Sequence, residues 1–350
     1  MRHQHQQTSQ QQSDQHPPSS SSATGTNSDQ PAAIVVETLE HRRFAEFCDA
    51  CKRYRYIGLC YGSPGVGKTL SARHYANWEN VQAYWNHQCQ TKALLKEISK
   101  GSIAFYTSPV VSSPGHLERD IAKTRSLLHR VAIERARRYE EARMTRLLHR
   151  AEKLRDPKRN PDGYRSDEAF KMENAFYEQR NRAMRVASTL PDPTALLVID
   201  EADRLKETGL EQVRSIFDHG GIGLVLIGMP GIEKRLARYP QFYSRIGFVH
   251  EFRPLGAKEI RELLDQRWTP LGVHLPQHPL DPETVAAIIR ITGGNFRLLN
   301  RLLTQMERIL EINSLQQVTK AVVELRVRAW SLGRPKRRHC LEFGGQGGEG

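Results

Sequence analysis

The sequence predicts an α/β protein whose parallel sheet is followed by a region built of helices alone. Two unbroken apolar runs, at 195–199 and 223–228, are typical of strands buried on both faces of a parallel sheet. A Gly-rich loop at 62–69 stands between a third apolar run and a helical pattern. Beyond residue 257 the apolar residues recur only at helical spacing. Strands alternating with helices, then helices alone, indicate an α/β domain with a helical lid.

The individual elements follow from apolar periodicity and from turn residues along the chain. Strands are predicted at 56–61, 103–107, 195–199, 223–228 and 248–252. Helices are predicted at 37–53, 69–78, 257–268, 282–292, 296–312 and 316–330. The segment 117–187 has few helix breakers apart from those at 156–163, which predicts two charged helices joined by a turn.

These elements divide the chain into four regions. The ends, 1–33 and 331–350, are rich in Gln and Ser or in basic residues and Gly, and both are predicted to be unfolded because they have little apolar surface to bury. Between them we expect an α/β nucleotide-binding domain over 34–255, with the helical hairpin inserted at about 117–188. A helical lid over 256–330 follows.

Composition restricts the class of protein. No apolar run approaches the length needed to cross a bilayer, and residues 1–14 are polar rather than apolar, which argues against a membrane span and a secretory signal and predicts a cytoplasmic protein. The formal net charge of +13 favours contact with phosphate-rich or other anionic surfaces.

Five cysteines are scattered without the spacing of a disulfide framework. Cys48 and Cys51 form one CxxC pair, but no second pair stands at zinc-site spacing, and only His41 offers a third ligand. The two cysteines share helical periodicity with Phe44 and Phe47. We therefore interpret them as buried thiols on a helix face.

The Gly-rich loop fits the P-loop pattern G-x-x-x-x-G-K-[ST], and it has the strand before and the helix after that the pattern requires. Its glycines allow backbone N–H groups to surround phosphate oxygens, and the helix N-terminus adds partial positive charge. Lys68 would reach the β- and γ-phosphates of ATP, and the Thr69 hydroxyl would bind Mg²⁺. The predicted nucleotide-binding residues are Gly62, Ser63, Pro64, Gly65, Val66, Gly67, Lys68, Thr69 and Asp200.

The strand at 195–199 ends in the acidic pair that a P-loop requires. Asp200 would hold the magnesium ion, and Glu201 would polarise the attacking water. A solvated acidic cap after a strand is the simpler interpretation, and the P-loop upstream argues against it. The run Asp200-Glu-Ala-Asp203 also matches a helicase motif, but the chain has no room for a second helicase domain.

The order of these parts resembles the AAA+ family, and within it the ATPases that accompany DDE transposases, the TniB, TnsC and Mu B group. The resemblance covers roughly 36–330 and is sharpest at 196–300, in the runs 198–206, 213–218 and 221–228. It implies an AAA+ P-loop NTPase core that hydrolyses ATP.

Two arginines match positions with roles in this family. Arg245 matches the arginine that such ATPases insert into a neighbouring subunit's site, and Arg297 matches the lid arginine that senses the γ-phosphate. The simpler interpretations are a surface arginine and a helix-start arginine. The strand at 224–227 departs from the family pattern, because Met229 stands where a polar residue should orient the lytic water. Hydrolysis is then slow, or another side chain supplies that contact.

The hairpin insertion is the predicted DNA-binding region. Residues 117–188 hold 19 Lys and Arg against 12 Asp and Glu, a difference of +7. A compact AAA+ core would need only a short helix here. The candidate phosphate contacts are Lys123, Arg125, Arg130, Arg137 and Arg138, and a second basic cluster lies at 334–338. A solvated hairpin with ion pairs such as Glu134–Arg138 is an equal alternative. No base-reading motif appears.

The resemblance implies a homo-oligomer, a ring or filament, that assembles on double-stranded DNA with ATP and Mg²⁺ and regulates a partner DDE transposase or integrase. Three alternatives remain open. They are a helicase loader or replication initiator, a secretion-type ATPase without DNA binding, and an ATP-binding scaffold that does not hydrolyse.

Overall fold

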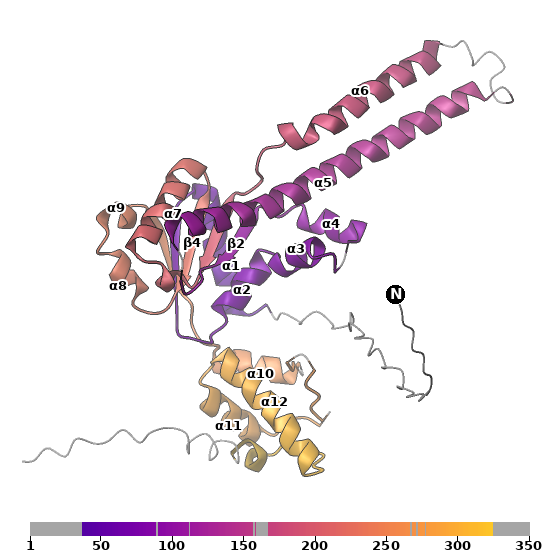
Figure 1. Ribbon diagram of the computed structural model, residues 1–350. Helices are drawn as coiled ribbons and strands as arrows, with labels where there is room; N and C mark the ends of the chain where they lie inside the picture. Colours follow the sequence, from indigo (N-terminus) through magenta and orange to yellow (C-terminus); the bar gives the residue numbers. More distant parts are fainter. Residues whose placement is uncertain are drawn as a thin grey trace, which may run out of the picture. The chain divides into compact units, whose positions relative to one another are not determined.

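The computed structural model describes residues 37–324 except 89, 112, 157, 159–166, 267, 271 and 277 (Figure 1). The predicted unfolded ends, the basic cluster at 334–338 and most of the turn of the hairpin lie outside the described residues.

A five-stranded parallel sheet in the order β2-β3-β4-β1-β5 forms the centre of the α/β part. Its strands are β1 Ile57–Tyr61, β2 Ile103–Thr107, β3 Leu196–Asp200, β4 Gly223–Gly228 and β5 Ile246–Glu251. The side chains of β3 and β4 are fully buried, whereas those of the edge strand β5 alternate between half-buried and exposed. All five predicted strands are confirmed, with bounds that shift by at most two residues, and the predicted parallel sheet is confirmed with them.

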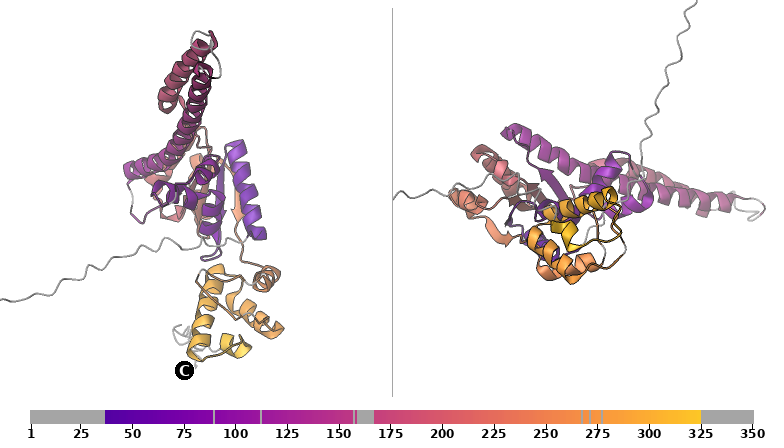
Figure 2. Two further views of the ribbon diagram at one scale, coloured as in Figure 1. Left: turned by 90° about the vertical axis from the view of Figure 1, so that its right-hand side faces the viewer. Right: turned by 90° about the horizontal axis from the view of Figure 1, so that it is seen from below.

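Helices cover both faces of this sheet (Figure 2). Those before the insertion are α1 Leu39–Tyr54, α2 Lys68–Tyr75, α3 Trp78–Trp85 and α4 Lys92–Ile98, and those after it are α7 Glu207–Gly220, α8 Ile232–Leu236 and α9 Pro240–Tyr243. Helix α1 contacts β1, β4 and β5 through a buried face that includes Phe44, Phe47, Cys48 and Cys51. Both cysteines are therefore buried thiols, and among the described residues no group of His, Cys, Asp or Glu is arranged to hold a metal ion.

The predicted helix at 69–78 is two helices. The chain turns at Asn77, whose φ of 49° lies in the left-handed region, so α2 ends at Tyr75 and α3 starts at Trp78. The helix α7 was not predicted. Its apolar residues Leu210 and Val213 are buried, although no element was predicted for residues 207–220.

The insertion is a pair of long helices, α5 Pro114–Arg155 and α6 Asp167–Thr189, which lie side by side (Figure 1). Ser113 caps α5, with its hydroxyl accepting a hydrogen bond from the His116 N–H. The first turns of α5 belong to the core, since Leu117, Ile121 and Leu128 are fully buried against the sheet side. Only the later part forms the hairpin, so α5 links the core and the insertion without a break.

The C-terminal helices have an apolar cluster of their own. They are α10 Ala257–Asp265, α11 Pro282–Thr292 and α12 Phe296–Ile312. The helix predicted at 316–330 is helical at 320–324, and the remainder lies outside the described residues. In the part of the chain that the structure describes, no helix combines the length and apolar character of a bilayer span.

Candidate functional site

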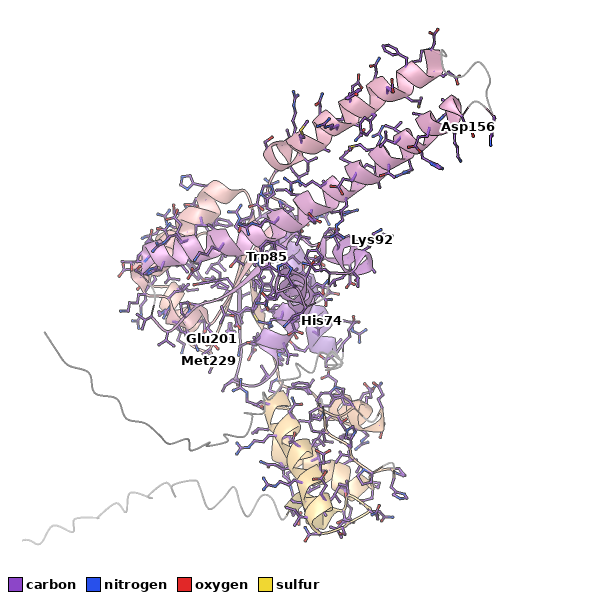
Figure 3. The ribbon with its side chains drawn as sticks, turned by 45° about the vertical axis from the view of Figure 1, so that its right-hand side comes forward. His74, Trp85, Lys92, Asp156, Glu201 and Met229 are labelled. Atoms are coloured by element: carbon purple, nitrogen blue, oxygen red, sulfur yellow. The ribbon has the colours of Figure 1, made fainter. Side chains whose placement is uncertain are left out.

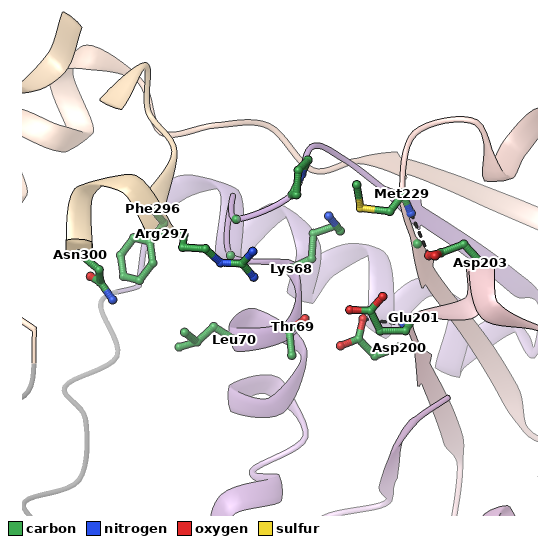
Figure 4. Close-up of a pocket in the computed structure, with 14 residues that line it drawn as sticks. Lys68, Thr69, Leu70, Asp200, Glu201, Asp203, Met229, Phe296, Arg297 and Asn300 are labelled. Carbon is green, nitrogen blue, oxygen red and sulfur yellow. Dashed lines mark hydrogen bonds between the residues drawn. The ribbon is translucent and has the colours of Figure 1, made fainter. Parts of the chain in front are cut away.

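The loop Gly62–Thr69, the end of β3 and the end of β4 meet at the carboxyl edge of the sheet, where open α/β sheets bind ligands. Glu201 and Met229 lie close together at this edge, far from Asp156 at the end of the insertion (Figure 3). The edge encloses a cavity of about 250 Å³, lined by residues of the P-loop, the acidic pair and α12 (Figure 4).

The P-loop has the backbone that its glycines permit. Gly65 and Gly67 have φ of 81° and 114°, in the region that favours glycine. The Lys68 Nζ is buried and donates hydrogen bonds to the Gly62 carbonyl at 2.6 Å and the Ser63 carbonyl at 3.0 Å. Burial lowers the pKa of Lys68. A charged donor thus lies inside a turn of backbone, in the arrangement that binds phosphate oxygens.

The acidic pair is held at the end of β3. Asp200 is buried and accepts a hydrogen bond from the Glu201 N–H at 2.9 Å. Burial raises the pKa of Asp200, and the Thr69 hydroxyl, the Glu201 N–H and Lys68 oppose that rise. Glu201 has a φ of 55°, so the chain turns sharply after the strand, and its side chain, like that of Asp200, lines the cavity. The oxygens of Thr69 and Asp200 are the ligand type that Mg²⁺ prefers, so these residues fit a magnesium ion.

Asp203 is one residue of this site that the sequence interpretation missed. Its Oδ1 accepts a hydrogen bond from the Met229 N–H at 3.2 Å, and both residues line the cavity (Figure 4). Arg235 holds the turn that carries Asp203 by donating to the carbonyls of Ala202, Asp203 and Leu205. The sequence signal for Asp203 is the acidic residue at the fourth position of the run 200–203, which also fits a helicase motif.

The start of α12 contacts the P-loop. The Asn295 Oδ1 caps α12 by accepting from the Leu298 N–H at 3.1 Å, and its Nδ2 donates to the Pro64 carbonyl at 2.8 Å. The Arg297 N–H donates to the Gly65 carbonyl at 2.9 Å. The side chain of Arg297 lines the cavity together with those of Phe296 and Asn300, which the sequence interpretation did not assign. The pattern Gly-Gly-Asn at 293–295 signals a helix start but not its contact with the loop.

Arg245 does not line this cavity. Its Nε and Nη2 form an ion pair with Asp218 at 2.6 and 3.0 Å, and its Nη1 donates to the Gln241 carbonyl. This guanidinium holds the pKa of Asp218 below its usual range. The Arg245 carbonyl accepts from the Ile57 N–H at the first residue of β1, whereas the P-loop follows the last residue of that strand. Arg245 is therefore about 15 Å from the P-loop, the length of a five-residue strand.

The five basic residues predicted to contact DNA differ in their partners. Lys123 pairs with Asp120 at 3.5 Å, Arg125 with Asp192 at 2.8 Å, and Arg138 with Glu134 at 2.7 Å. Arg130 and Arg137 form no ion pair with any described residue. The pair of Arg138 with Glu134 is the one that the solvated-hairpin alternative predicts.

A protein-family profile described as an AAA domain matches residues 51–236. A potential ATP-binding protein from Staphylococcus aureus is 38% identical over 293 residues, which cover 83% of this chain and 93% of that protein.

Among solved structures, the RuvB Holliday junction branch migration motor from Thermotoga maritima aligns with a TM-score of 0.44 and 14% identity, over 86% of this chain and 72% of that one. The Orc1 protein of Aeropyrum pernix, solved in complex with DNA, aligns with a TM-score of 0.44 and 18% identity, over 88% and 68%.

The family match covers more than half of the chain and includes the P-loop, Asp200 and Glu201, and the relative spans most of the chain's length. The protein belongs to the AAA domain family of P-loop ATP-binding proteins.

Proposed function

We propose that this protein is an ATPase that oligomerises, binds double-stranded DNA without sequence specificity, and regulates a partner transposase of the DDE class. Within each subunit, Lys68 binds the nucleotide phosphates, and Thr69 and Asp200 hold Mg²⁺. The metal supplies charge stabilisation to the transferring phosphoryl group. Glu201 accepts the proton of the attacking water, and Arg297 senses the γ-phosphate from the lid.

Asp203 supplies the polar contact that Met229 lacks. The Met229 N–H donates a hydrogen bond to the Asp203 carboxylate at the cavity wall, and Met229 stands at the predicted sensor position. A carboxylate oxygen there can accept a hydrogen bond from the attacking water. Glu201 removes the other proton of that water. This contact supports hydrolysis in spite of the methionine.

The observation that carries the oligomer is the position of Arg245. It lies at the amino end of the strand whose carboxyl end leads into the P-loop, so it is out of reach of its own site. As the arginine that stabilises the phosphoryl charge, Arg245 would therefore serve the site of another copy of the chain.

A mixing experiment tests this assignment. Lys68→Ala subunits lose nucleotide binding and Arg245→Ala subunits lose the donated arginine, so each variant alone is expected to be inactive. A mixture restores turnover, because a Lys68→Ala subunit still donates Arg245 to the intact P-loop of its neighbour. Mixtures no more active than the separate variants would exclude a trans role.

DNA binding is supported by the basic insertion, where Arg130 and Arg137 retain uncompensated charge. Binding to duplex DNA of any sequence is expected to weaken steeply with salt. The transposase partner is supported by the resemblance of residues 196–300 to transposition ATPases. A DDE integrase encoded beside this gene, and its co-purification with this protein in the presence of ATP, are the expected observations.

A scaffold that binds ATP without hydrolysing it is the second candidate, and Met229 favours it. Comparing ATP turnover by the unchanged protein and by Glu201→Gln separates the two. Hydrolysis through Glu201 predicts a loss of about a hundredfold or more. Equal rates in the two proteins would leave Glu201 without a catalytic role, and the scaffold predicts no turnover above background in either.

A further inference from the structure

A second cavity, of about 440 Å³, lies between the end of α3 and the side of α5, away from the P-loop. Its size falls within the ~300–1,000 Å³ that is usual for ligand sites. One wall is aromatic, formed by Tyr84 and Trp85, and the other carries Arg130, Arg137 and Arg138. Trp85 lies beside α5 at the foot of the insertion (Figure 3).

The charges of this cavity are only partly compensated. Glu134 is the acidic residue of its lining, and its carboxylate is engaged by Arg138 at 2.7 Å. Arg130 and Arg137 are exposed and form no ion pair with a described residue. They stand seven residues apart on α5, which places them on one face of the helix two turns apart. An anion that enters the cavity can therefore bind these two arginines without displacing a carboxylate.

The aromatic wall orients one of these arginines. The Arg130 guanidinium lies over the Trp85 ring, 4.9 Å from its centre, and Trp85 is half-buried. This cation–π contact keeps the Arg130 guanidinium at the Trp85 ring, and no ion pair with a described residue competes for its N–H groups. A base can stack at this pair, because bases stack on arginine planes as they do on aromatic rings. Arg138 also donates to the Tyr84 hydroxyl at 3.4 Å, which joins the two walls.

We propose that this cavity binds a nucleotide unit of a DNA strand, with its phosphate on Arg130 and Arg137 and its base stacked over the Arg130–Trp85 pair. The inference rests on the proposed DNA binding and makes it more specific. A base inside a duplex is stacked on its neighbours and cannot enter, so the cavity selects an unpaired nucleotide, as at a distorted or opened site. Bases of every kind offer a ring face, so the preference is for strand structure and not for sequence.

The test uses the full-length chain and a labelled single strand of about 12 nucleotides, a length within the site sizes of single-strand binding proteins. Three further ligands are compared with it. They are a strand of equal charge with abasic sites, a duplex, and free deoxyadenosine monophosphate. Binding is measured by fluorescence anisotropy at several salt concentrations. Retained binding of a fluorescent ATP analogue at the P-loop shows that each variant is folded.

Arg130→Gln and Arg137→Gln are each expected to weaken single-strand binding about fivefold to tenfold and to reduce the salt slope by about 0.7, the value for one phosphate contact. Trp85→Leu removes the preference for the normal strand over the abasic strand, and Trp85→Phe keeps part of it because a ring remains. Arg150→Gln, with the same charge change at an exposed position further along α5, stays within about twofold of the unchanged protein.

The outcomes separate this inference from the proposed function. If the unchanged protein binds neither strand nor duplex at about 50 mM salt, DNA binding itself is wrong, and the inference falls with it. If it binds DNA and the cavity variants behave like Arg150→Gln, only the inference is overturned. Binding of the free monophosphate as tight as that of the strand would overturn it as well, since the cavity would then be a small-molecule site.

Discussion

The main-chain N–H of Met229 donates a hydrogen bond to the carboxylate of Asp203, 26 positions earlier in the chain, at 3.2 Å. The two residues come from the ends of neighbouring strands, β4 and β3, and both line the nucleotide cavity. The carboxylate thus lies beside the main chain of position 229, where the family pattern has a polar residue. The methionine is compatible with hydrolysis if Asp203 orients the water.

Asp203→Ala is expected to lower the turnover number by about tenfold to a hundredfold while ATP affinity stays within about twofold, since misplacing a reacting water costs rate rather than binding. Single-turnover hydrolysis and equilibrium ATP binding measure the two quantities. Asp265→Ala, an exposed carboxylate on α10, is the control and should change neither. Unchanged turnover in Asp203→Ala would remove Asp203 from the mechanism.

Arg245 and Arg297 are expected to differ in what they control. Arg297 lines the cavity of its own subunit, so Arg297→Ala should weaken ATP binding. Arg245 is at the opposite edge of the sheet, so Arg245→Ala should leave binding unchanged and lower turnover by about a thousandfold, as loss of an arginine finger does. Arg245→Lys should be nearly as inactive, because an ammonium lacks the paired N–H donors. The idea is wrong if Arg245→Ala weakens binding as much as Arg297→Ala.

Asn295 serves two purposes that substitution can separate. Asn295→Ser keeps an oxygen to cap α12 and loses the amide that donates to the Pro64 carbonyl, so the lid stays folded and ATP affinity falls about fivefold, the effect of one hydrogen bond. Asn295→Ala loses the cap as well, and its free energy of unfolding falls by a further ~1 kcal/mol. Isothermal titration and urea unfolding measure the two effects. Equal ATP affinity in Asn295→Ser and the unchanged protein would contradict a latch between lid and loop.

The buried thiols should make stability decline at alkaline pH. Burial raises the pKa of Cys51 to about 12 and raises the pKa of Cys48 and Cys60 as well. In the unfolded chain these thiols lose their protons near pH 8.5, whereas the folded protein retains them. Stability that is fully present below pH 8.5 is therefore lost as pH rises toward the folded pKa values, by about 1 kcal/mol per thiol and pH unit.

Urea unfolding at pH 7, 8.5 and 10 measures this decline, and Cys51→Ala should show a shallower one. Thiol reagents should label the three cysteines slowly at pH 8 until urea is added. Rapid labelling of the folded protein would show that these thiols are accessible.

The sequence by itself determined the strands, the P-loop and the acidic pair. Each is a local pattern: the apolar runs at 195–199 and 223–228 have the length and composition of buried strands, and the residues 62–69 carry their own loop geometry in their glycines. It also determined the hairpin, because residues 116–155 contain no Pro or Gly and form one continuous helix within α5.

Only the tertiary structure decided which of the candidate residues act together. Asp203 meets Met229, Asn295 meets the P-loop, and Trp85 meets Arg130 through contacts between segments remote in the sequence. Asp192 pairs with Arg125, one of the candidate DNA contacts, in the same way. Periodicity reports which face of an element is buried, but not what lies opposite it. That depends on the strand order and on how each helix packs, and both are set by burial of the whole core.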